Sequence, residues 1–275
     1  MRRCARRLAA CLAAAFSAVP VAPAAAQDLA VDLELVLAVD VSGSMDAQER
    51  LLQRDGYVQA FLHPDVIAAV ISGLNGRIAV SYVEWAGPRS QTLVMPWRMV
   101  DGQKTAEAVS AELARAESPR IRGTSISGAL AFAGALFDDN GFVSGRQVID
   151  ISGDGPNNMG PPVLPVRDAV LARGITINGL PVTLRPSGPW STQYGNLPAP
   201  LLDIYYEDCV IGGPGAFFLS VQASEQLAEA IRRKLVLEIA GRAPAPVPAQ
   251  LAQAPPRIDC LIGEKTRPQW LDENR

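Results

Sequence analysis

The chain contains a single histidine, His63, among its 275 residues. This residue stands before Pro64 at the expected end of a helix, and nothing in the sequence brings it towards a serine. A serine hydrolase needs a base beside its nucleophile, so that class is disfavoured. The sequence also lacks a GxSxG nucleophile elbow, a P-loop and a GxGxxG fingerprint. These absences point away from hydrolysis and nucleotide binding, and we expect a protein that is not an enzyme.

Long apolar runs are also missing, except at the N-terminus. Residues 1–26 combine a basic start, an apolar middle over 8–21 and small residues before Gln27, which is the pattern of a secretory signal peptide. A membrane anchor is the alternative, but the apolar part is too short and contains Pro20. We therefore expect an exported protein, periplasmic or secreted, with no membrane span in the mature chain.

Cysteines are few, and only Cys209 and Cys260 lie outside the leader. In an oxidising compartment such a pair favours a disulfide, with two buried thiols as the alternative, because a metal site would need further Cys or His ligands. Removing the leader's four arginines leaves 21 basic against 28 acidic residues, a formal net charge of −7. An acidic surface repels phosphate backbones, so we expect no nucleic-acid partner.

The order of the expected elements is typical of an α/β fold. Residues 28–241 are long enough for one such domain, and a Pro/Ala linker over 242–257 and a disulfide-tethered tail over 258–275 follow it. We expect a doubly wound, mostly parallel sheet with one antiparallel edge strand and helices on both faces. The expected strands are 33–39, 77–85, 91–97, 147–151, 175–182 and 216–221, and the expected helices are 47–61, 65–72, 104–116, 127–137, 163–173 and 224–240.

The sequence DVSGSM at residues 40–45 follows the first long apolar strand. Asp40, Ser42 and Ser44 therefore leave a strand end together, and open parallel sheets bind ligands beyond such ends. Two further loops should bring oxygen donors there, with Thr124 in RGTSISGAL and Asp154 in DISGDG. Carboxylates and hydroxyls suit Mg²⁺ or Mn²⁺ and suit zinc poorly. The sequence thus predicts a site for one divalent cation.

Each of these donors also has a purely structural alternative. Aspartates at strand ends bond nearby backbone N–H groups, and serines or threonines before helices cap them. Around the site, Asp46, Asn157 and Asn158 are candidates to hydrogen-bond the ligands rather than to bind the ion.

These three loops occur in the order of the metal-ion-dependent adhesion site of von Willebrand factor A-type (VWA) domains, and the sequence resembles that family over residues 28–241. Phrases such as YVEWAG, DISGDG and YYEDCVIGGPGAF resemble, more narrowly, a subgroup of exported bacterial A-type domain proteins that has no assigned function. The resemblance implies a three-layer, Rossmann-like fold.

The resemblance also implies a set of ligands and a function. Its cation would be held directly by three hydroxyls and directly or through water by two carboxylates, which are here Ser42, Ser44, Thr124, Asp40 and Asp154. One coordination position is left for an Asp or Glu of a partner protein. We therefore expect a cation-dependent adhesion or assembly module, with a subunit of a periplasmic assembly complex or a metal-dependent hydrolase as alternatives. The family likeness further implies a shift of the last helix, 224–240, and we hypothesise that the cysteine bridge restrains it.

Four residues are expected to form a partner-binding rim. Glu84 and Trp85 end a strand parallel to the first one, and Trp190 and Tyr194 lie in the long loop 183–200. The alternative is that Trp85 packs in the core and the loop only covers the sheet edge.

Overall fold

The structure is a computed structural model, and it describes residues 28–116, 122–184, 197–242 and 257–266. The expected leader and most of the expected linker lie outside the described residues. None of the helices within these ranges has both the length and the apolar character needed to cross a membrane.

Five strands form the central sheet in the order β4-β3-β2-β6-β7. Neighbouring strands run parallel, except that β4 is antiparallel to β3 at one edge. This confirms the mostly parallel sheet with one antiparallel edge strand. The strands are β2 (Glu34–Asp40), β3 (Ile78–Trp85), β4 (Gln91–Val100), β6 (Gln147–Gly153) and β7 (Thr176–Pro181), and a separate parallel pair joins β1 (Leu29–Ala30) to β5 (Phe142–Val143).

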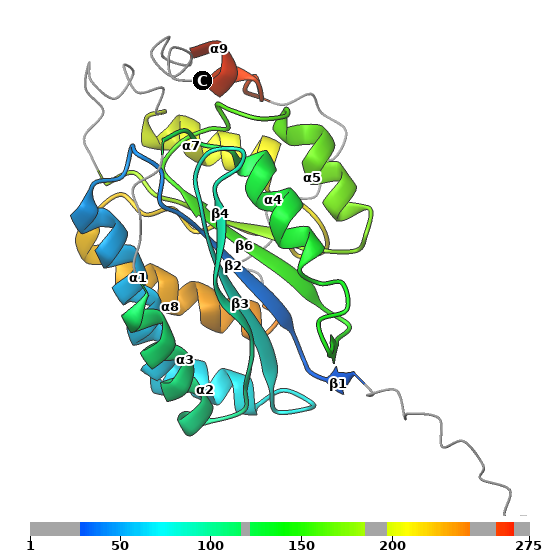
Figure 1. Cartoon of the computed structure of the whole chain (residues 1–275). Helices are drawn as coiled ribbons and strands as arrows, with labels where there is room; N and C mark the ends of the chain where they lie inside the picture. The colour runs from blue at the N-terminus through cyan, green and yellow to red at the C-terminus, as the bar shows by residue number, and fades with distance from the viewer. Residues whose placement is uncertain (1–27, 117–121, 185–196, 243–256, 267–275) are drawn as a thin grey trace, which may run out of the picture.

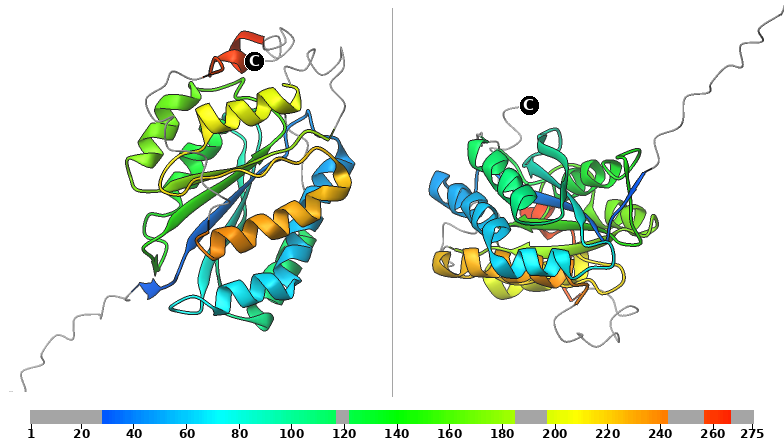
Figure 2. Two further views of the ribbon diagram at one scale, coloured as in Figure 1. Left: turned by 180° about the vertical axis from the view of Figure 1, so that it is seen from behind. Right: turned by 90° about the horizontal axis from the view of Figure 1, so that it is seen from below.

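Helices cover both faces of this sheet, because alternate side chains of each buried strand point to opposite sides. In β2, Leu35 and Leu37 enter one hydrophobic core, whereas Val36 and Ala38 enter the other. Figures 1 and 2 show the sheet between these two groups of helices. The first group is α1 (Ala47–Leu62), α2 (Pro64–Ile71), α3 (Gln103–Arg115) and α8 (Ser224–Ile239), and the second is α4 (Ile126–Ala135), α5 (Val163–Leu171) and α7 (Ala199–Tyr205), which continues into a π-helical turn, η1 (Tyr206–Val210).

The expected strand over residues 216–221 is wrong. This segment runs beside β7 but makes only isolated bridges, from Phe218 to Gly179 and from Val221 to Val182. One cause is local, because the backbone N–H of Phe217 donates to the side chain of Asn178, at 3.0 Å, rather than to a strand carbonyl. Between the two bridges the ladder is broken at Pro181 of β7, which has no N–H to donate to the carbonyl of Leu219.

The parallel strands end together at one edge of the sheet. In the register of the sheet, Asp40 at the end of β2 lies opposite Trp85 at the end of β3. On the other side of β2, Val39 lies opposite Ser152, two residues before Asp154. The loops after β2 and β6 therefore leave the sheet side by side. A short C-terminal helix, α9 (Ile262–Thr266), lies at the same end of the molecule (Figure 1).

Candidate metal centre

The loop after β2 is a tight turn that gathers side-chain oxygens. Asp40 Oδ1 accepts a hydrogen bond from the backbone N–H of Ser42 at 2.6 Å. The hydroxyls of Ser42 and Ser44 are 2.9 Å apart. The Ser44 hydroxyl donates to Asp154 Oδ1 at 2.7 Å. Four of the five expected donors are thus linked directly, although Asp154 comes from a different loop.

Thr124, the fifth expected donor, is bonded through its backbone to Asn158, in the turn that follows Asp154. Its N–H donates to Asn158 Oδ1 and its carbonyl accepts from the N–H of Asn158, both at 2.9 Å. The next residue, Ser125, donates its N–H to the carbonyl of Ala86, just after β3, at 2.7 Å. The loop carrying Thr124 is therefore held against the turn that follows Asp154.

The centre has a buried floor and a more open side. Asp40, Ser42 and Thr124 are buried, whereas Ser44 and Asp154 are partly exposed. Burial raises the pKa of Asp40 well above its usual value, the charge of Asp154 raises it further, and hydrogen bonds from Ser42 act in the opposite direction. Two carboxyl groups that disfavour each other's charge would be stabilised by a cation between them.

The chemistry of the donors fits a divalent cation of the Mg²⁺ type. Two carboxylates and three hydroxyls are hard ligands, and Mg²⁺ completes such a set with water or a further carboxylate. Asp40 Oδ2 is buried and has no hydrogen-bond partner among the residues that the structure describes, so nothing described there compensates the burial of this oxygen, as a cation would. Among all the described residues, no group of three or more His, Cys, Asp or Glu side chains is placed to hold a metal ion. The candidate centre therefore differs from a zinc site built from such side chains.

Helix α1 supports the turn from below, and the sequence did not single out the residues that do so. Arg50 Nη1 donates to the carbonyl of Met45 at 2.6 Å, and Gln53 Nε2 donates to the carbonyl of Asp40 at 3.0 Å. Both side chains are buried. The signal available in the sequence was their spacing of three residues on one face of the helix, just after the turn.

Tyr206 is a third residue that sequence reasoning missed. A Cβ built on Gly153 would lie 2.9 Å from the Tyr206 hydroxyl and 3.0 Å from Asp40 Oδ2, so only glycine fits there. Burial raises the pKa of Tyr206 well above its usual value, and the charges of Asp40 and Asp154 raise it further. The hydroxyl therefore stays protonated beneath the carboxyl groups.

The three expected supporting residues have different roles. Asn158 bonds Thr124, and Asn157 Oδ1 accepts from the N–H and hydroxyl of Ser127, at 3.0 and 3.2 Å. Asp46 instead begins α1, where it and Glu49 form a reciprocal capping box.

The expected rim is wrong for two of its four residues. Glu84 and Trp85 do end β3 beside Asp40, but they are only 2% and 0% exposed. Trp85 belongs to a hydrophobic core, and Glu84 forms a buried ion pair with Arg54 of α1. A large aromatic ring at a strand end gains more from burial than from contact with water. Trp190 and Tyr194 lie outside the described residues.

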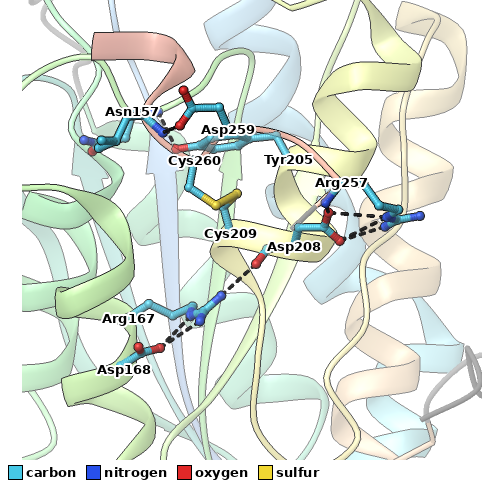
Figure 3. The surroundings of a disulfide bond; sticks show 10 residues. Asn157, Arg167, Asp168, Tyr205, Asp208, Cys209, Arg257, Asp259 and Cys260 are labelled. Atoms are coloured by element: carbon cyan, nitrogen blue, oxygen red, sulfur yellow. Dashed lines mark hydrogen bonds and ion pairs between the residues drawn. A yellow bond between two sulfur atoms is a disulfide. The ribbon is translucent and has the colours of Figure 1, made fainter. Parts of the chain in front are cut away.

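Cys209 and Cys260 form the expected disulfide, which is drawn in Figure 3. Both sulfurs lie in the core on the face of α4 and α5, whereas α8 packs on the opposite face. The bridge therefore makes no direct contact with α8, and a restraint on this helix through residues 243–256, which lie outside the described residues, stays a prediction. It instead attaches the C-terminal segment to η1.

The sheet order, the two helical layers and the three loops at one edge define a VWA-type α/β fold. The chain belongs to the family described as "Protein of unknown function (DUF1194)", whose model matches residues 30–243. None of the curated proteins compared with the sequence matches it.

Solved structures with the same fold include proteins of animals and bacteria. Proximal thread matrix protein 1 from the mussel byssus, in a structure with a zinc-occupied MIDAS motif, is 15% identical with a TM-score of 0.55, and the match covers 78% of this chain and 49% of that one. The pilus adhesin SpaC of Lactobacillus rhamnosus GG is 13% identical, with a TM-score of 0.54 and coverage of 78% and 31%. A von Willebrand factor type A protein from Catenulispora acidiphila is 16% identical, with a TM-score of 0.50 and coverage of 76% and 43%. The match spans about half or less of each of these proteins, and at such identities it shows the fold alone.

Proposed function

We propose that this protein is a divalent-cation-dependent protein-binding module, used for adhesion or assembly, that is not an enzyme. Ser42, Ser44 and Thr124 would bind Mg²⁺ or Mn²⁺ directly, and Asp40 and Asp154 directly or through water. The remaining coordination position would take an Asp or Glu of a partner protein. Two carboxylates balance the charge of the ion, and neutral hydroxyl ligands leave it able to attract a third carboxylate.

The observation that carries this proposal is the Ser42–Ser44–Asp154 chain of hydrogen bonds beside buried Asp40. Simple caps or turn residues would each bond their own backbone. Here a hydroxyl from one loop instead bonds a carboxylate from another loop, which suits a ligand set assembled around an ion. The zinc-occupied MIDAS motif of the mussel relative supports a metal at the corresponding place in this fold.

A hydrolytic function has less support, because the only histidine is remote from the loops. His63 lies between α1 and α2, with its ring partly exposed and its Nδ1 accepting from the N–H of Asp65. Helix α1 has 16 residues and separates it from the 40–45 turn by about 24 Å. No imidazole base therefore serves Ser42 or Ser44.

We further propose that the protein acts outside the cytoplasm, in the periplasm or after secretion. The signal-peptide pattern of residues 1–26 supports this location. The Cys209–Cys260 disulfide supports it independently, since structural disulfides persist mainly in oxidising compartments.

Calorimetric titration tests the cation site directly. Wild-type protein should bind Mg²⁺ and Mn²⁺ at one site, and Asp154→Asn should weaken binding by more than 10-fold because it removes one of two charged ligands. The matched control is Asp168→Asn, because Asp168 is an exposed aspartate of α5 that pairs only with the neighbouring Arg167 among the contacts described. Equal affinity in wild type and Asp154→Asn would refute the site.

Capture from a native envelope extract tests the partner. Proteins retained by wild-type bait with Mg²⁺, but lost with chelator or with Asp154→Asn, would be candidates that present a carboxylate. Retention that ignores both changes would contradict cation-dependent binding.

A further inference from the structure

The C-terminal residues 257–266, here called the clasped tail, are attached to the domain by more than the disulfide. Arg257 forms ion pairs with Glu207 and Asp208 of η1. Figure 3 shows the pair with Asp208, which lies next to Cys209. Ile258 and Ile262 pack against the same core as the two cysteines. The clasped tail extends beyond residues 30–243, where the family model matches. Through these contacts the clasped tail is nevertheless packed as part of the folded domain.

The clasped tail ends on the turn that follows Asp154. A Cβ built on Gly263 would lie 2.1 Å from the backbone carbonyl oxygen of Asn157, so α9 approaches this turn as closely as only glycine allows. The next residue, Glu264, accepts a hydrogen bond at 2.7 Å from Asn157 Nδ2. One turn of helix thus contacts both the backbone and the side chain of Asn157.

Asn157 connects four separate segments of the chain. Its N–H donates to the Tyr205 hydroxyl of α7 at 3.1 Å, its Oδ1 accepts from Ser127 of α4, and its Nδ2 donates to Pro161 and Glu264. The side chain is fully buried. A buried amide whose donors and acceptor are all satisfied fixes the positions of its partners, because losing any one bond leaves a buried polar group unpaired.

The residues held by Asn157 flank proposed metal ligands. Asp154 lies three residues before it in the same turn, and Asn158 bonds the backbone of Thr124. Ser127 lies three residues after Thr124, at the start of α4. The contacts of the clasped tail therefore reach two of the three loops that would surround the cation.

We propose that the clasped tail is a positioning element of the cation site, which holds Asp154 and Thr124 in their binding geometry through Asn157. This inference rests on the proposed function. It assigns the disulfide a role in the site itself, since Cys260 lies three residues before Gly263 and restricts α9 to this end of the sheet. Residues that orient metal ligands typically change metal affinity by 10- to 100-fold when they are replaced.

Two kinds of variant test the proposal. Cys209→Ala with Cys260→Ala releases the tail without leaving a free thiol, and Glu264→Ala removes one contact with the bridge intact. Lys265→Ala is the matched control, because Lys265 is exposed and pairs with Asp259 inside the tail. Glu264→Gln is the rescue, because its amide oxygen still accepts from Asn157.

Two measurements are made on each variant. In metal-free protein, hydrogen exchange at the amides of Thr124, Ser127 and Asn157 should accelerate by about 10-fold or more, because local opening becomes easier when the tail is released. In calorimetry, Mg²⁺ affinity should fall by about 10-fold in both test variants. Exchange in the central strand β2 should not change, which shows that the domain has stayed folded.

The outcomes separate this proposal from the proposed function. Failure of wild-type protein to bind Mg²⁺ or Mn²⁺ overturns the proposed function and the positioning role with it. Normal wild-type binding with unchanged affinity in the double cysteine variant and in Glu264→Ala overturns the positioning role alone. Weaker binding that Glu264→Gln restores and Lys265→Ala leaves intact supports it.

Discussion

A buried charge cluster between α8 and the sheet offers a sharp test of the fold's energetics. Lys234 of α8 lies 2.6 Å from Asp150 Oδ1 of β6 and also contacts the Glu238 carboxylate one turn later on its own helix. Asn178 Nδ2 donates to Glu238 Oε1 at 3.0 Å. The side chains of Lys234, Asp150 and Glu238 are at most 1% exposed. One ammonium group thus pairs with two carboxyl groups that are shielded from solvent.

Replacing this lysine by methionine keeps its length and removes its charge. Lys234→Met leaves Asp150 and Glu238 buried without their cation, and breaking a buried pair in this way costs about 3–5 kcal/mol. That cost is a large part of the total stability of about 5–15 kcal/mol that is usual for a domain. Combining Lys234→Met with Asp150→Asn and Glu238→Gln removes all the charges together and should restore much of the loss.

The loss should depend on pH in a defined direction. Burial, and then the charge of Asp150, raises the pKa of Glu238 to about 7, and burial also raises the pKa of Asp150. A carboxyl group whose pKa is higher in the folded than in the unfolded chain stabilises the fold at low pH. This contribution is lost as the pH rises from the pKa of the unfolded state to the pKa of the folded state. For Glu238 this range is about 4.5 to 7. Without Lys234 both pKa values rise further, so the variant should lose little at pH 5 and most at pH 8.

Urea denaturation of both proteins between pH 5 and pH 8 measures this difference. Arg233→Met is the control, because Arg233 is the exposed neighbour on the same helix and its replacement should change stability by no more than about 0.5 kcal/mol. A loss in Lys234→Met that is the same at pH 5 and pH 8 would refute the reasoning. So would a loss below about 1 kcal/mol at pH 8.

Two further predictions concern the candidate metal centre. Asp40→Asn keeps the oxygen that accepts from the N–H of Ser42 but removes a buried charge close to that of Asp154. In urea denaturation the metal-free variant should be more stable than wild type by about 1 kcal/mol, and it should lose Mg²⁺ binding. Lower stability of the variant would contradict this. Gly123 has a φ of +85°, and a Cβ there would lie 2.3 Å from the Met159 sulfur. Gly123→Ala should therefore lower the free energy of unfolding by about 1–2 kcal/mol in the same assay. Gly145→Ala is the control and should lower it far less, because a Cβ on Gly145 meets nothing within 4 Å.

The sequence predicted elements well where local pattern and burial agree. The apolar run at residues 33–39 became the central strand, and the turn between residues 85 and 91 joined the antiparallel pair β3 and β4. It failed at 216–221, where an apolar, β-prone segment has one backbone donor bound by Asn178 and faces Pro181, which has no N–H to complete the ladder. It also gave no indication of the helical segment over residues 199–210, because Pro198 and Pro200 are residues typical of loops.

For the candidate centre, sequence reasoning found the donors but not what holds them. Spacing after strand ends was enough to bring Asp40, Ser42, Ser44 and Asp154 together. The burial of Trp85 depends on packing from the second layer of helices, which one strand cannot reveal. Lys234 likewise appears as an ordinary helix charge until the fold places it against Asp150.

The 40–45 turn and the turn after Asp154, which both contribute to the candidate metal centre, are held in place by different parts of the fold. The 40–45 turn is supported by Arg50 and Gln53 of α1, a 16-residue helix that also packs against α3 and α8. The turn after Asp154 depends on Asn157, which is held partly by a five-residue helix at the end of the clasped tail. Local opening needs less free energy where fewer buried contacts are lost. Partial unfolding should therefore release Asp154 and Thr124 first, while the 40–45 turn stays in place. The site would then lose affinity for the cation before the central sheet unfolds.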